Sequence, residues 1–157
     1  MKRVSVLWCL LVSLVVAPGL ARSQPSAEQR QALLAYKLTR PLADKLLAAL
    51  PEMTRYVVAK PNFQEIVARS AKQSPGERLA QVEADPGAMA ILKKHGLTAR
   101  EYVVGVPALR MALMRAQSGD GPGSEALVVS ADNLAFARAN LAELKPKLDA
   151  ADGIARP

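Results

Sequence analysis

The sequence has very few of the residues that form disulfides, metal sites and base-stacking surfaces. It contains one cysteine (Cys9) and one histidine (His95), and aromatic residues make up 4% of its 157 residues. A lone cysteine cannot form a disulfide within the chain, and zinc, haem or copper sites need several Cys or His donors. We therefore expect a fold held by its hydrophobic core, with no metal and no cofactor.

A secretory signal peptide is predicted at the N-terminus. Two basic residues precede Val4–Ala17, a run of fourteen uncharged residues, and Pro18 then interrupts any helix. Small residues at Ala21 and Ser23 suit a signal peptidase. Fourteen residues are short for a bilayer span, which needs about 20. We expect cleavage after Ser23, or alternatively after Ala21, and export to the periplasm or the medium.

Removal of residues 1–23 lowers the net charge of the chain, and the lower value is the one that bears on possible partners. Three basic residues and no acidic ones are lost, so the net charge falls from +7 to +4. That value is ordinary for a soluble domain, and the positive charges are spread along the chain. Because aromatics are also scarce, nucleic-acid binding is not expected. No later segment is long and apolar enough to span a membrane.

The rest of the chain has the pattern of helices joined by short breaks. Ala and Leu recur at three- and four-residue spacing, and residues 126–129 are the one short β-like run. We predict a single all-α bundle of five to seven helices over residues 24–150. Residues 117–129 are predicted as a flexible loop and residues 151–157 as a disordered tail.

Several helix ends carry recognisable capping signals. Two segments, Ser74–Glu77 and Thr98–Glu101, match the capping box, in which a Ser or Thr is followed three residues later by Glu. Asp85 followed by Pro86 predicts another helix start. Gly96 suits the left-handed position just after a helix end.

Two further boundaries follow from proline and polar residues. Pro51 and Pro107 lie inside helical patterns, where proline is expected to bend or split a helix. Ser130 is expected to cap the last helical region, which is predicted to restart at Asn140, with Glu143 three residues on.

The segment Val103–Met114 is apolar nearly all round and is expected to be the central helix of the bundle. Gly105 within it would allow a neighbour to approach closely. An alternative is that this helix lines a pocket for an acyl or lipid-like ligand, because methionine adapts to irregular shapes. The candidate pocket residues are Tyr102, Val106, Met111 and Met114.

The densest basic cluster is formed by Lys93, Lys94 and His95 together with Arg100. Three of these residues precede Gly96 and are explained by the negative end of a helix dipole. The alternative is a site that binds anionic lipid or phosphate.

No catalytic constellation is evident. A serine-histidine-acid set would have to use His95 at a predicted helix end. Glu83 with Asp85, or Glu101 with another acid, are the carboxylate pairs that can be considered for general acid–base work. We therefore expect no enzymatic activity and no catalytic residue.

Three segments together carry a resemblance. They are Leu38-Thr39, residues 94–102 (Lys-His-Gly-Leu-Thr-Ala-Arg-Glu-Tyr) and residues 132–140 (Asp-Asn-Leu-Ala-Phe-Ala-Arg-Ala-Asn). In this order the chain resembles a set of small exported α-helical bacterial proteins. The resemblance implies an exported, bacterial, helical protein. The set has no established activity, so the resemblance assigns no site residue.

Two functions from different classes are compatible with these patterns. The first is a non-enzymatic interaction or accessory protein of the bacterial cell envelope that engages another exported protein. The alternative is a carrier that holds a small hydrophobic ligand in the core of the bundle.

Overall fold

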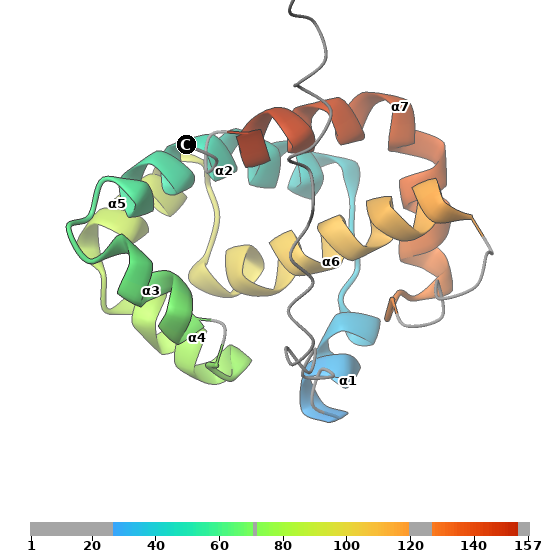
Figure 1. Cartoon of the computed structure of the whole chain (residues 1–157). Coiled ribbons are helices and arrows are strands. Elements are labelled where there is room, and N and C mark those ends of the chain that lie inside the picture. The colour runs from blue at the N-terminus through green and yellow to red at the C-terminus, as the bar shows by residue number, and fades with distance from the viewer. Residues whose placement is uncertain (1–26, 71, 120–126, 154–157) are drawn as a thin grey trace, which may run out of the picture.

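The computed structural model describes residues 27–70, 72–119 and 127–153, and within these ranges it contains seven α-helices and no strand (Figure 1). The all-α prediction is confirmed, and the seven helices are the largest number that was expected. The predicted signal peptide, residues 1–23, lies outside the described residues. The helices are α1 (Ala27–Ala35), α2 (Arg40–Val58), α3 (Phe63–Ser70), α4 (Pro75–Glu83), α5 (Pro86–Lys94), α6 (Ala99–Ser118) and α7 (Ala131–Gly153).

The predicted capping residues mark the ends of the middle helices. At α4 the Ser74 hydroxyl accepts from the Glu77 N–H (3.2 Å) while the Glu77 carboxylate accepts from the Ser74 N–H (2.7 Å). Thr98 and Glu101 make the same reciprocal pair at α6. Gly96 has φ of +62° after the end of α5. All three predictions are confirmed, because these signals are local to a few residues.

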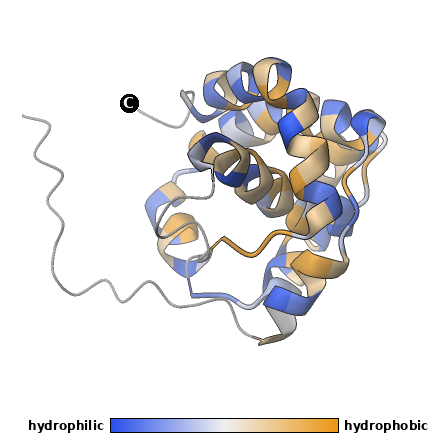
Figure 2. Cartoon of the chain, turned by 90° about the vertical axis from the view of Figure 1, so that its right-hand side faces the viewer, coloured by the Kyte–Doolittle hydropathy of each residue, from blue (hydrophilic) through white to orange (hydrophobic). Residues whose placement is uncertain are grey.

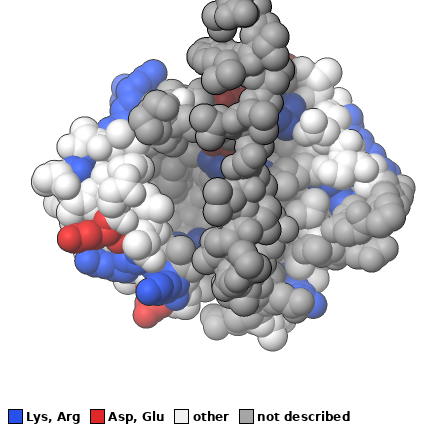
Figure 3. All heavy atoms as spheres, in the orientation of Figure 1, with Lys and Arg blue, Asp and Glu red and all other residues white. Residues whose placement is uncertain are grey.

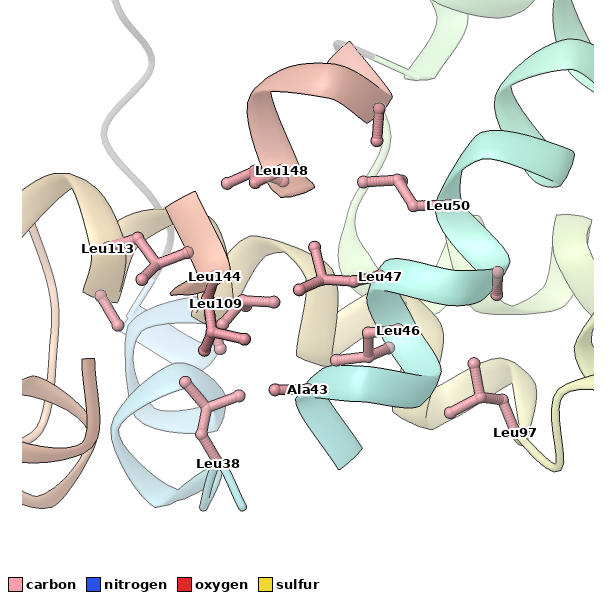
Figure 4. Close-up of a cluster of buried hydrophobic side chains, with 14 of the residues drawn as sticks. Leu38, Ala43, Leu46, Leu47, Leu50, Leu97, Leu109, Leu113, Leu144 and Leu148 are labelled. Atoms are coloured by element: carbon pink, nitrogen blue, oxygen red, sulfur yellow. The ribbon is translucent and has the colours of Figure 1, made fainter. Parts of the chain in front are cut away.

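Helix α6 is the central helix, as its sequence predicts. It contacts α1, α2, α4, α5 and α7, and it buries Gly105, Ala108, Leu109, Ala112 and Leu113. The hydrophobic side chains of α2, α6 and α7 point toward one another in Figure 4, where Leu46, Leu109 and Leu144 are among the fully buried residues. Hydrophobic and hydrophilic bands alternate along the surrounding helices (Figure 2), as expected for helices with one buried face.

Proline does not divide the long helices. Helix α2 is continuous through Pro51 and α6 through Pro107. In α2, Leu50 and Met53 flank Pro51 and are buried in the core. Their packing offsets the single backbone hydrogen bond that proline removes.

The predicted restart at Asn140 is wrong, because α7 is one continuous helix from Ala131 to Gly153. The side-chain nitrogen of Asn140 donates to the Phe136 carbonyl of its own helix (2.8 Å), and its side-chain oxygen accepts from Arg40 of α2 (3.1 Å). Glu143 instead forms an ion pair with Arg40 of α2. Both residues therefore serve the contact between α2 and α7. Ser130 does cap this helix, since its hydroxyl accepts from the Asn133 N–H (3.3 Å).

The ends of α6 and α7 also differ from the sequence prediction. Helix α6 continues to Ser118, so the first two residues of the predicted loop are helical. Helix α7 includes residues 151–153, the start of the predicted tail, and Ala151 is buried. An ion pair between Arg110 of α6 and Asp152 holds this last turn against the bundle. Residues 120–126 and 154–157 lie outside the described residues.

One buried polar residue, Asn133, joins the start of α7 to the connection between α1 and α2. Its side-chain oxygen accepts from the Leu38 N–H (2.9 Å), and its side-chain nitrogen donates to the Tyr36 carbonyl (2.7 Å). Asn133 is 2% exposed. The Leu38 N–H is buried and the Tyr36 carbonyl is partly buried, so both need a partner from the protein. The Asn133 amide supplies it and thereby fixes the connection that leads into α2.

Candidate functional site

The N-terminal end of α5 is fixed to α2 through Asp85. Its carboxylate accepts from the N–H groups of Gly87 (3.1 Å) and Ala88 (3.2 Å), which caps the helix. From α2 and the residues after it, the Tyr56 hydroxyl donates to the same carboxylate (2.6 Å), and Lys60 forms an ion pair with it. One carboxylate therefore both starts α5 and positions it.

The C-terminal end of α5 is fixed to α2 by a second set of polar contacts. Lys94 donates to Glu52 (2.7 Å), and the His95 Nε2 lies 3.4 Å from the same carboxylate oxygen. The hydrogen bond from Lys94 lowers the pKa of Glu52. Lys45 donates to the Gly96 carbonyl (3.2 Å). Helix α5 is thus held at both ends against the same neighbour.

This arrangement leaves one face of α5 open beside the first turn of α6. Ala88 and Leu92 face the core, whereas Pro86, Met89, Ala90 and Lys93 recur at the spacing of a second helical face. The backbone turn at Gly96 returns the chain along this face, because the Leu97 N–H donates back to the Leu92 carbonyl (2.9 Å). The result is a mainly apolar hollow, here called the α5–α6 hollow. Its lining residues are Glu83, Pro86, Met89, Ala90, Lys93, Gly96, Leu97, Thr98, Ala99 and Arg100.

Three charged side chains at this hollow are exposed and have no hydrogen-bond or ion-pair partner among the described residues: Glu83, Lys93 and Arg100. Nearby cations behave differently, since Lys45, Lys60 and Lys94 all contact groups of the protein itself. The hollow therefore combines apolar lining with charges that remain available to another molecule.

The structure divides the basic cluster that the sequence suggested as one unit. Lys94 and His95 are directed to Glu52 of α2, whereas Lys93 and Arg100 line the α5–α6 hollow. His95 is the residue that ends α5, in the position expected from the sequence. Neighbours in sequence are separated here because successive residues on a helix point about 100° apart.

The four residues proposed for a ligand pocket do not share one hollow that the structure describes. Tyr102, Val106 and Met111 are partly buried and pack against the core cluster, and Met114 is 50% exposed. Burial raises the pKa of Tyr102 to about 12. None of the four lines the α5–α6 hollow. None of them lines a second hollow beside α1 either, which is formed by Ala27, Arg30, Gln31, Leu34 and Ala35. The carrier hypothesis stays a prediction.

Of the carboxylates considered for acid–base chemistry, Asp85 and Glu101 have structural contacts. Asp85 caps α5, and Glu101 caps α6, where hydrogen bonds from Thr98 lower its pKa. Glu83 is the exposed acid at the hollow. Within residues 27–70, 72–119 and 127–153, no three His, Cys, Asp or Glu side chains are grouped to hold a metal ion.

Charge on the face shown in Figure 3 is mixed, with basic and acidic side chains side by side at the end formed by α3 and α4.

In the described ranges, no helix has both the length and the hydrophobicity that a bilayer crossing requires. No family model matches this chain, and neither a curated protein nor a solved structure matches it. The chemistry of the hollow is therefore the basis for a functional proposal.

Replacing the Asp85 carboxylate is expected to reduce the amount by which the free energy of unfolding falls at acidic pH. Burial acts to raise the pKa of Asp85, but hydrogen bonds from Lys60, Tyr56 and the backbone outweigh it and lower the pKa from 3.8 to about 2. A lowered pKa stabilises the folded state above pH 4, and this stabilisation is lost as the pH falls toward 2. Between pH 6 and pH 2, the unchanged protein should lose about 2 kcal/mol more stability than Asp85→Asn.

Urea denaturation followed by circular dichroism, repeated along the pH series, measures this difference. Asp132→Asn removes an exposed carboxylate from the first turn of α7 and is the matched control. It should keep the pH dependence of the unchanged protein. A pH dependence for Asp85→Asn equal to that of the control would contradict the expected role of Asp85.

Proposed function

We propose that this chain is a non-enzymatic interaction protein of the bacterial cell envelope that engages another exported protein through the α5–α6 hollow. The observation that supports the proposal is the combination of apolar lining with three exposed charges that have no partner within the part of the chain that the structure describes. Protein interfaces commonly have an apolar centre and a polar rim. Export is supported by the sequence pattern of residues 1–23 and by the resemblance to exported helical proteins.

The firm attachment of α5 also favours binding over chemistry. A surface fixed at both ends loses little conformational freedom when a partner docks, so less of the binding energy is spent on ordering it. Asp85 and Glu101, which adjoin the lining residues in sequence, are occupied in capping, and Glu83 is the acid in the lining itself. The charged side chains of the hollow, Glu83, Lys93 and Arg100, therefore suit the binding of a partner.

A photo-crosslinking residue at Ala90 tests the proposal in cells that export the protein. Ala90 lines the hollow and is exposed, while Ala68 on α3 is exposed and lies outside it. We expect a protein partner to crosslink from position 90 and not from position 68. Lys93→Glu combined with Arg100→Glu should reduce that crosslink about tenfold, because both cations become carboxylates that repel the partner's acidic groups.

Arg69→Glu with Lys72→Glu is the matched control, since it makes the same change in charge at exposed residues outside the hollow. It should leave the crosslink unchanged. Equal crosslinking from positions 90 and 68, or equal loss in both double variants, would count against the proposal. The intact mass of the exported protein, expected to begin at Gln24, establishes that the mature form was tested.

The carrier alternative has a separate readout on the same purified protein. Native mass spectrometry that shows extra mass in the range of a fatty acid or lipid, lost on denaturation, would favour a carrier. A mass equal to that of the polypeptide alone would favour the interaction protein.

A further inference from the structure

Two of the three available charges, Glu83 and Lys93, lie toward opposite ends of α5 in the α5–α6 hollow. Glu83 is the last residue of α4, and only Ala84 and Asp85 separate it from the start of α5. Lys93 is in the last turn of α5, and Arg100 is in the first turn of α6, four residues after Gly96. Glu83 therefore lies toward the N-terminal end of α5 and Lys93 at its C-terminal end, so the hollow is acidic at one end of this helix and basic at the other.

The distance between the two ends fits a short peptide segment. From Pro86 to Lys93 the helix rises about 10 Å at about 1.5 Å per residue. This span corresponds to about two turns of a helix or about three residues of an extended chain. Between the charges, the partly exposed Met89 and the exposed Ala90 provide an apolar surface above the buried Leu97, and methionine can adapt to the shape of a docked side chain.

We infer that the partner segment is amphipathic and carries opposite charges at its two ends. Its carboxylates pair with Lys93 and Arg100, its cation pairs with Glu83, and its apolar side chains cover the surface between them. This inference rests on the proposed function, and it defines both the chemistry and the direction of the bound segment. A helix with apolar residues at three- and four-residue spacing has the required surface.

The charge at Glu83 also separates a peptide from an anionic membrane or a nucleic acid. Those ligands present negative charge along their whole surface, so they gain from Lys93 and Arg100 but are repelled at the opposite end. A segment with one acidic and one basic end is attracted at both.

Two synthetic helical peptides with the same apolar residues test the inference on the full mature protein. The bipolar peptide has two Glu at one end and two Lys at the other, and the acidic peptide has Glu at both ends. The bipolar peptide should bind about fivefold more tightly in an NMR titration. A nitroxide on its acidic end should broaden the amides of residues 97–101 more than those of residues 84–88.

Glu83→Lys should reverse the preference, because both ends of the hollow then attract carboxylates. Glu65→Lys on exposed α3 makes the same charge change outside the hollow and should keep the original preference. Equal affinities for the two peptides, an unchanged preference in Glu83→Lys, or tighter binding of phosphatidylglycerol vesicles than of either peptide would overturn the inference.

The failure of this inference differs from failure of the proposed function. A crosslink from Ala90 that depends on Lys93 and Arg100, without a preference for the bipolar peptide, leaves the interaction function and removes the bipolar partner. Absence of the Ala90 crosslink removes the interaction function itself.

Discussion

Replacing Asn133 with alanine is expected to lower the free energy of unfolding by about 3 kcal/mol, because one buried and one partly buried backbone group each lose a hydrogen bond. Those groups are the Leu38 N–H and the Tyr36 carbonyl, which lie 2.9 and 2.7 Å from the Asn133 side chain. The side chain is 2% exposed, so water cannot readily replace it. Urea denaturation followed by circular dichroism measures the change.

Asn140→Ala is the control, because it removes the same side chain from the same helix. Asn140 is only partly buried and bonds to Arg40 (3.1 Å) and to the Phe136 carbonyl. The loss there should be below about 1 kcal/mol, since water can solvate the freed groups. If the two variants lose the same stability, Asn133 does not brace the α1–α2 connection.

The importance of Asn133 illustrates what the sequence does not reveal. Its two partners are 95 and 97 residues away along the chain, and no local pattern identifies which of several asparagines will be buried. The capping boxes at Ser74 and Thr98 were predictable because both partners lie within one turn. The same contrast explains the error at Asn140, where a contact with α2 took the place of a local cap.

The candidate site was only partly predictable for the same reason. The sequence identified Lys93 and Arg100 as basic residues close to the end of a helix, and it identified Gly96 as the turn between them. It did not show that Glu52 would engage Lys94 and His95. Only the packing of α5 against α2 decides which cations remain available to another molecule. From the sequence, Glu83 was considered for general acid–base catalysis, and its position at one end of the hollow was not predicted.

Gly105 was correctly predicted as a point of close approach, and Gly105→Ala is expected to destabilise the protein by about 2 kcal/mol through overpacking. A Cβ atom at this position would lie 2.8 Å from the Tyr36 hydroxyl oxygen and 2.9 Å from a Leu46 methyl carbon. In an exposed helix the same change would stabilise by up to about 1 kcal/mol. The sign of the measured change therefore reports the packing between α6, Tyr36 and Leu46.

Gly76→Ala in α4 is the matched control, because a Cβ atom there meets nothing within 4 Å. It should stabilise by about 0.5 kcal/mol as a favourable helix residue. A second readout is Tyr36, whose pKa is raised to about 12, first by burial and then by Glu101. In Gly105→Ala the displaced hydroxyl should become more exposed, and its pKa, followed by NMR of the ring carbon, should fall toward 10.

Combining Gly105→Ala with Tyr36→Phe separates steric overlap from a general weakness of α6. Tyr36→Phe removes the hydroxyl that is closest to the new methyl group, together with its hydrogen bond to the Glu101 carbonyl (3.2 Å). If overlap is the cause, the double variant should be more stable than the sum of the two single losses predicts. Strict additivity would mean that α6 moves away from Tyr36, and the strain would then lie at Leu46, where a smaller side chain should restore stability instead.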